Sequence, residues 1–177
     1  FFHHVKHSLF GGRLGASQIE GMQATLDYWE WRHSDKPLHY LAYIFATDKR
    51  ESDHTMQPVE EGATRLSGTK LRKWQRALRY YPWYGRGKPQ TTWKRNYETI
   101  DRLFAVGCVA NPDILLDLKV STKVMVEGML AGIWTGHKLA DYWDGNTFDF
   151  EGARRIINGT DVAELIAGYA QSFLVAL

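Results

Sequence analysis

Cysteine is almost absent from this sequence, because Cys108 is the only one among 177 residues. A lone cysteine forms no disulfide within its chain, which fits folding in a reducing cytoplasm. We expect Cys108 to be a small, buried, apolar residue. Long apolar runs are also missing, since none approaches the roughly 20 residues that a membrane-spanning helix needs. We therefore expect no stable insertion into a membrane.

Excess charge of either sign is small, because 22 Lys and Arg residues stand against 20 Asp and Glu residues. The resulting formal net charge of +2 argues against a nucleic-acid-binding protein. Among the seven histidines only His3 and His7, in an N-terminal cluster expected at the surface, have H-x-x-x-H spacing. None has H-E-x-x-H spacing, and no third ligand accompanies Asp53 and His54. We expect neither a metal nor any other cofactor.

Aromatic residues, in contrast, are plentiful at 14% of the chain, with seven Trp and nine Tyr. Their flat apolar faces and polar edges suit both a packed core and a sugar-binding groove. The length suits one domain with a sizeable core. We therefore treat residues 1–177 as a single domain.

Hydrophobic spacing and helix-end signals predict a mainly α (α+β) fold with a helical body. Residues 53–67 are less periodic and contain Pro58 and Gly62, so they predict a short hairpin or an irregular lobe, with a cleft between this lobe and the body. The first expected helix starts at a Ser17 capping box, and the next ones cover 38–50, 69–79 and 92–104. A further helix is expected from an N-cap at Ser121 to Trp134. Shorter helices are expected over 137–143 and 149–158, and the last one begins at Asp161.

Three carboxylates lie close together in the sequence at the end of an apolar helix. Glu51 ends the helix expected over 38–50, and Glu60 and Glu61 follow nine and ten residues later. Glycoside hydrolysis needs two carboxyl groups that flank one bond. In an extended segment Glu60 and Glu61 point to opposite faces, so only one of them faces the cleft. On spacing alone, Glu51 is more typical of a solvated helix end than of a catalytic acid.

Three sequence blocks resemble phage endolysins, which belong with the family 19 chitinases in the lysozyme-like superfamily. Residues 50–61, RESDHTMQPVEE, look like the family's H-E-T-x-x-T-M-Q-P-[IV]-x-E segment. Residues 83–97, WYGRGKPQTTWKRNY, are similar to its Y-Y-G-R-G-x-x-Q-L-[ST]-W-x-x-N-Y segment, and residues 156–159 match its I-I-N-G turn. The opening of the chain, SLFGG at 8–12 and the helix over 18–29, also looks like these proteins, so the blocks follow the family's order.

This resemblance implies roles for the catalytic residues. Glu51 takes the place of the proton-donating acid, and Glu61 that of the base that activates water, with Glu60 kept as the alternative for relatives with a shorter spacing. Thr92 stands where the family holds the nucleophilic water, although it also suits an N-cap of the helix that follows. Family members invert the anomeric carbon, which implies carboxyl groups about 6.5–9.5 Å apart.

The resemblance also implies residues that contact substrate. Gln90 and Asn96 match polar groups that line the sugar subsites, and Asn158 matches a further substrate contact or, alternatively, a helix C-terminal cap. Tyr84 is either a sugar platform or part of the core. Arg86, between two glycines, is expected to brace the turn. Uncharged hydrogen-bonding groups suit N-acetyl and hydroxyl groups, which carry no charge.

The sequence departs from the family pattern at several positions. Arg50 replaces the usual His, Ser52 replaces Thr, Thr91 replaces Leu, and Lys88-Pro89 replaces an apolar pair. These changes bear on activity and optimum pH more than on fold.

A basic segment bears on the substrate. Residues 62–83 contain no acid, which indicates either a solvated helix face or a patch that faces an anionic polymer such as peptidoglycan. Chitin is neutral and gains nothing from such a patch. The cations of this segment are Arg65, Lys70, Arg72, Lys73, Arg76 and Arg79.

These features together predict a monomeric peptidoglycan hydrolase, muramidase-type, that cleaves β-1,4 bonds between N-acetylated sugars. The resemblance to endolysins implies synthesis in the host bacterial cytoplasm and access to the cell wall after holin-type release. A chitinase on the same fold, a catalytically degenerate glycan-binding domain or phage structural part, and a lytic transglycosylase are the alternatives. The paired carboxylates favour hydrolysis over the transglycosylase reaction, which needs only one essential acid.

Overall fold

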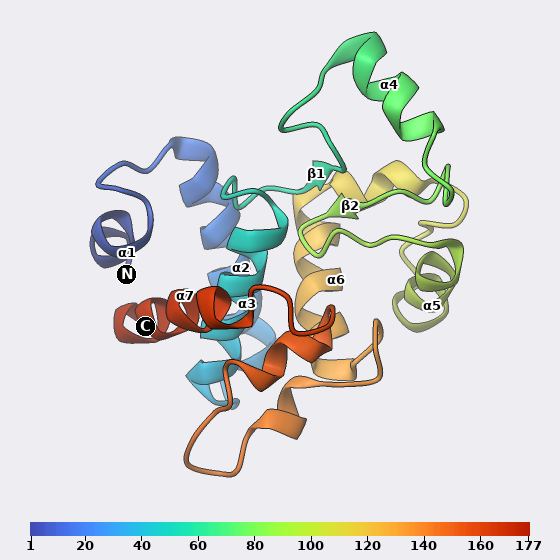
Figure 1. The fold of residues 1–177 in the computed structure, drawn as a ribbon. Coiled ribbons are helices and arrows are strands. Elements are labelled where there is room, and N and C mark those ends of the chain that lie inside the picture. The colour runs from blue at the N-terminus through green and yellow to red at the C-terminus, as the bar shows by residue number, and fades with distance from the viewer.

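The computed structural model describes residues 1–177, and Figure 1 shows a mainly helical chain with one two-stranded sheet. The mainly α prediction is confirmed. None of the helices combines the length and hydrophobicity needed to cross a membrane. The α-helices are α1 Phe2–Leu9, α2 Ala16–His33, α3 Leu38–Glu51, α4 Gly68–Arg76, α5 Lys94–Phe104, α6 Leu118–Ala131 and α7 Ala163–Ala176. The 3-10 helices are η1 Pro112–Leu116, η2 Leu139–Tyr142 and η3 Gly152–Ile156, and the strands are β1 Val59–Glu60 and β2 Arg86–Gly87.

Helix α3 lies at the centre of the core. Every residue from Tyr40 to Lys49 is buried, so this helix is enclosed on all sides rather than amphipathic. It packs against α7, where Phe45 stacks on Phe173 with ring centroids 5.2 Å apart. A second, smaller apolar cluster joins α5, η1 and α6, and Cys108 is fully buried within it, as predicted. The end of α3 is therefore rigidly placed, and Glu51 with it.

The small sheet joins two segments that are distant in the sequence. Val59 pairs with Gly87 and Glu60 with Arg86, in antiparallel register. The prediction of a hairpin within 53–67 is wrong, because β1 pairs with a strand that follows α4 instead. Figure 1 shows α4, in green, standing away from the helical body above this sheet. The irregular-lobe alternative describes this region better.

Two predicted helix caps are wrong. Helix α2 begins at Ala16, one residue before the expected Ser17 cap, and its entry is fixed by the Gly15 N–H donating to Gln18 Oε1 over 2.9 Å. Helix α6 begins before Ser121, because Asp117 accepts the cap bond from the Val120 N–H. Ser121 is buried inside α6 and accepts from the Lys88 N–H over 2.7 Å, a long-range contact that local sequence does not reveal.

Two other segments differ from prediction in the type of helix that they form. The segment expected to be helical over 137–143 contains only the 3-10 helix η2, and the one over 149–158 contains only η3. Each of these 3-10 helices has at most five residues. The sequence signals located both segments correctly but did not distinguish a 3-10 turn from an α-helix.

Two lysines lie in the core, and their surroundings differ. Lys88 forms an ion pair with Asp48 over 2.6 Å, and both side chains are fully buried. Lys49 has no carboxylate partner. Its ammonium contacts His54 and lies 4.2 Å from the centre of the Tyr169 ring. Burial lowers the pKa of Lys49 to about 8.

Replacing Lys49 with Met should stabilise the protein at neutral pH. Below pH 8 the folded chain must bury a charge that the unfolded chain leaves in water, at a cost of about 2–3 kcal/mol. Because the pKa of Lys49 in the folded chain, about 8, lies below the ordinary lysine value of 10.5, the cost disappears as pH rises between these two values. Urea unfolding of wild type and Lys49→Met should therefore give stabilities that differ at pH 7 and converge toward pH 10.

The matched control is Lys138→Met, since Lys138 is exposed. This variant should track wild type at every pH. A Lys49→Met protein that is less stable than wild type at pH 7 would show that the contacts of the ammonium outweigh its burial cost.

Candidate functional site

A pocket of about 780 Å³ gathers residues from five parts of the chain. It is lined by the end of α3, the turn after β1, the β2–α5 loop with the start of α5, the segment after α6, and the turn after η3. A neighbouring hollow of about 610 Å³ has Glu51, Glu61, Gln90 and Asn158 in common with it. The two together form one open region on the surface. The predicted residues that line the larger pocket are Glu51, Glu61, Gln90, Thr92, Asn96 and Asn158.

Glu51, the last residue of α3, is held by an arginine that the sequence did not indicate. Arg154 in η3 donates from Nη1 to Glu51 Oε1 over 2.7 Å. Its side chain is 4% exposed, compared with 18% for Glu51, and its Nε donates to the Asp161 carbonyl. Arg50, which replaces the His that is usual at this position in the resembled family, is itself exposed. Glu51 thus has a fixed orientation at the pocket wall, with Oε2 outside this hydrogen bond.

Glu61 is held by two donors, one for each oxygen. The Tyr80 hydroxyl donates to Oε1 and the Gly85 N–H donates to Oε2, each over 2.7 Å. Burial and the bond to this carboxylate raise the pKa of Tyr80 to about 12, so the phenol keeps its proton and remains a donor. A Cβ on Gly85 would lie 2.8 Å from Gln90 Oε1 and 3.3 Å from the Glu61 side chain. A side chain at this position would have to displace the end of Gln90.

Glu60 faces the other way along the strand, as the alternation of side chains requires. Its Oε2 accepts from Arg72 over 2.7 Å and from Gln75 Nε2 over 3.3 Å, both on α4. Glu60 lines the smaller hollow but not the larger pocket. Glu60 therefore shares the smaller hollow with Glu51, but only Glu61 lines the larger pocket together with Glu51 and Thr92.

The β2–α5 loop presents the uncharged groups of the pocket. Gln90 Nε2 donates to the carbonyls of Val59 and Gly87, over 2.8 and 2.9 Å. Asn96 Nδ2 donates to the Thr92 carbonyl over 2.7 Å. Both side chains thus use their amide nitrogens to hold the loop, and no N–H of the chain donates to their amide oxygens. These oxygens are available as acceptors.

Thr92 and Asn158 differ from the capping roles considered for them. Thr92 Oγ donates to the Gln90 carbonyl over 3.0 Å, and the N-cap of α5 is Trp93, so the N-cap alternative for Thr92 is wrong. Asn158 is exposed and lies one residue beyond the C-cap of η3. Its Oδ1 accepts from the Gly159 N–H, which leaves its amide nitrogen facing solvent at the pocket rim.

Tyr84 lies outside the pocket. Its side chain is 5% exposed, and the Arg86 guanidinium stacks 3.7 Å from its ring centre. Of the two alternatives for Tyr84, the structure supports the core residue and not the sugar platform. Arg86 donates to Asp113 over 2.8 Å and to the Tyr97 hydroxyl over 3.1 Å. The prediction that Arg86 braces the turn is confirmed.

Several pocket residues carried no signal that we used in the sequence. Trp93 is 38% exposed, and Arg79 stacks over its ring at 4.9 Å. Trp134 follows the end of α6, and its indole N–H has no partner in the chain. An abundance of aromatics indicated that some would line a groove, but not which ones. The unpredicted polar lining residues are Arg95, Thr135, His137 and Arg155.

Comparison with known proteins gives no assignment: no family description, curated protein or solved structure matches this chain. No group of three or more His, Cys, Asp or Glu side chains is arranged to hold a metal ion. The function has to be inferred from the pocket itself. Two carboxylates at one pocket, each held by fixed donors and flanked by neutral polar groups and indole rings, can perform acid–base chemistry on an uncharged polar substrate.

Proposed function

We propose that this protein is a peptidoglycan hydrolase, an endolysin of muramidase type on a lysozyme-like fold, with the pocket as its substrate cleft. The observation that carries the proposal is that Glu51 and Glu61, ten residues apart in the sequence, line one pocket with Thr92. The resemblance to endolysins implies acid, base and water-holding roles for the same three residues. The lining of the pocket is mostly polar, as a glycan requires.

In this mechanism Glu51 donates its proton to the oxygen of the scissile β-1,4 bond. Glu61 accepts a proton from a water molecule, which attacks the anomeric carbon from the opposite face and inverts it. The hydroxyl of Thr92 helps to position that water. The C–O bond to the leaving sugar breaks as the bond from water forms. Glu51 is left as a carboxylate, which the hydrogen bond from Arg154 stabilises.

Charge distribution favours peptidoglycan over chitin as the substrate. Residues 62–97 carry ten Lys and Arg and no Asp or Glu. Arg86 and Lys88 are buried, and the other eight cations are exposed. The lactyl-peptide carboxylates of peptidoglycan provide negative charge near this region, and chitin provides none. The enzyme would act as a monomer, made in a bacterial cytoplasm and released to the wall through a holin-type partner.

The test is release of reducing ends from purified peptidoglycan and from chitin oligomers, with product masses and anomeric configuration recorded. Hydrated products of inverted configuration from peptidoglycan would support the proposal. Activity on chitin alone would support the chitinase alternative, and anhydro-sugar products the transglycosylase. Binding to walls without cleavage would indicate a glycan-binding domain.

Glu61→Gln and Glu60→Gln form a matched pair, since the two residues are neighbours with the same chemistry. We expect Glu61→Gln to lower hydrolysis about a hundredfold or more, because an amide cannot accept the proton from water. Glu60→Gln should stay close to wild type, since Glu60 binds Arg72 outside the larger pocket. Initial rates of reducing-end release measure both. The reverse result would assign the base to Glu60.

A further inference from the structure

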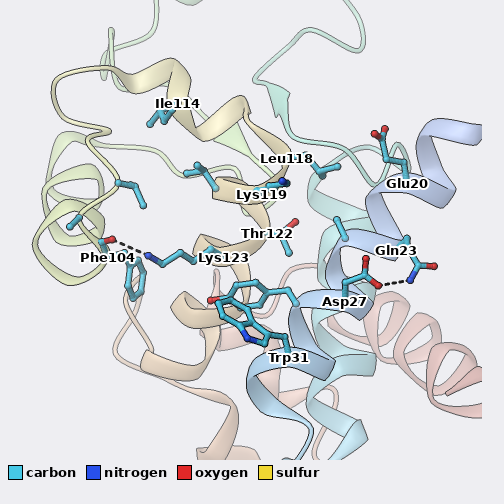
Figure 2. Close-up of a pocket in the computed structure, with 15 residues that line it drawn as sticks. Glu20, Gln23, Asp27, Trp31, Phe104, Ile114, Leu118, Lys119, Thr122 and Lys123 are labelled. Atoms are coloured by element: carbon cyan, nitrogen blue, oxygen red, sulfur yellow. Dashed lines mark hydrogen bonds between the residues drawn. The ribbon is translucent and has the colours of Figure 1, made fainter.

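A hollow of about 810 Å³ lies between α2, α6 and the end of α5, and shares no residue with the candidate site. Figure 2 shows its walls, with Trp31 on α2, Phe104 at the end of α5, and Lys119, Thr122 and Lys123 along α6. Nine of its 15 lining residues are hydrophobic. Its volume falls in the range of about 300–1,000 Å³ that small-molecule sites occupy.

The apolar surface of this hollow is unusually open to water. Trp31 is 73% exposed at its rim and packs edge-on against Tyr28, with ring centroids 5.9 Å apart. Phe104, Val106 and Ile114 continue the apolar surface on the other side. Contiguous apolar surface of this kind indicates a binding site, because a molecule that covers it removes hydrocarbon from water.

Two polar side chains on the α6 side, Thr122 and Lys119, make no side-chain hydrogen bond within the chain. Thr122 is 2% exposed, and its hydroxyl has no hydrogen-bond partner in the chain. Lys119, three residues earlier and on the same helix face, forms no hydrogen bond or ion pair. Figure 2 shows both side chains directed toward α2. A buried hydroxyl without a partner is costly, and a ligand oxygen would satisfy it.

The acids on the α2 side, in contrast, are already hydrogen-bonded. Asp27 accepts from the amide of Gln23 over 2.6 Å, and Glu20 accepts from Gln57 over 3.4 Å. Lys123 is also engaged, because it donates to the Phe104 carbonyl over 3.1 Å. These partners are neutral, so all four charges remain, with Glu20 and Asp27 on the α2 wall and Lys119 and Lys123 on the α6 wall. An anionic head therefore suits the α6 wall.

We propose that this hollow binds a small amphipathic anion, with an acyl or aromatic hydrocarbon body and one carboxylate or sulfonate head. The head lies against Lys119 and the Thr122 hydroxyl. The body covers Phe104, Val106 and Ile114 and reaches the Trp31 ring. This site is separate from the glycan pocket and does not depend on the proposed hydrolase activity.

The probe for this proposal is 1-anilinonaphthalene-8-sulfonate, an aromatic sulfonate that fluoresces in apolar surroundings, with decanoate as competitor. Titration of the folded protein should give saturable one-to-one binding that decanoate displaces. Val106→Asp should weaken binding at least about tenfold, because it puts a carboxylate beneath the anionic probe. The matched control is Leu103→Asp, since Leu103 is 46% exposed on α5 and lies outside the hollow.

A second pair of variants tests the head group without touching apolar packing. Lys119→Glu should weaken binding about tenfold or more, whereas Lys73→Glu, on exposed α4, should leave it unchanged. Thermal unfolding confirms that each variant is folded. Absence of saturable binding, or equal effects of Val106→Asp and Leu103→Asp, would overturn the proposal. So would a dimer, seen by light scattering, that Val106→Asp dissociates, because the occupant would then be a second copy of the chain.

Discussion

Replacing Glu51 with Gln should lower the rate of glycan hydrolysis about a hundred- to ten-thousand-fold, the usual contribution of general acid–base catalysis. Gln has the same shape as Glu but cannot protonate the leaving oxygen. Its amide oxygen can still accept the hydrogen bond that Arg154 donates to Glu51 Oε1 over 2.7 Å. The side chain should therefore keep its place, and the loss should appear in kcat rather than in KM.

Rates of reducing-end release from purified peptidoglycan measure this loss, with Glu164→Gln as the control. Glu164 is exposed in the first turn of α7 and lies outside both hollows of the site. Equal melting temperatures for the two variants would show that the fold is intact. Hydrolysis that persists in Glu51→Gln would remove Glu51 from the acid role. Activity would then have to come from another carboxylate in the same region.

The helical body was predictable because its signals are local. Apolar residues at helical spacing located α2, α3, α5 and α7 within a few residues. Caps were less predictable, because several residue types compete for each helix start. Ser121 is a residue type that favours the N-cap, but so is Asp117, which lies four residues earlier and caps α6. The pairing of β1 with β2 depends on a contact across α4, which no local pattern specifies.

The site divides in the same way between predictable and unpredictable residues. Glu51, Glu61 and Thr92 lie in motifs whose resemblance to endolysins implies roles for them, and all three line one pocket. Arg154 lies 103 residues after its partner Glu51. A partly buried carboxylate needs a hydrogen-bond donor, so a partner for Glu51 was to be expected. That general rule does not say which residue it is. Tyr84, in contrast, lies within a motif and still packs away from the pocket.

The buried Lys88–Asp48 pair shows how far a long-range contact can exceed what sequence indicates. Lys88 stands where the resembled family has an apolar residue, and the sequence alone indicated an effect on activity and optimum pH more than on fold. In the structure its ammonium donates to Asp48 over 2.6 Å, to the Gly21 carbonyl over 2.9 Å and to Thr25 over 3.2 Å. These partners lie on α2 and α3, so this single side chain ties the β2–α5 loop to the core.

Replacing Lys88 with Met should therefore destabilise the protein by about 3–5 kcal/mol, since it leaves the Asp48 carboxylate buried and unpaired. Lys88 is the only side chain that donates to this carboxylate, and Asp48 Oδ1 already has no partner. The sign is opposite to that expected for Lys49→Met, although both changes remove a fully buried ammonium. The difference follows from the partner, because Lys49 contacts no acid.

Urea unfolding at pH 7 measures this effect, and the double variant Lys88→Met/Asp48→Leu separates charge from packing. If the unpaired carboxylate causes the loss, removing it should recover most of the stability, since apolar residues of similar volume often replace a buried ion pair without cost. A double variant as unstable as the single one would assign the loss to the contacts with Gly21 and Thr25 instead. Because Lys88 lies two residues before Gln90, rates of glycan hydrolysis by the same two variants would show whether the core pair also holds the pocket loop in place.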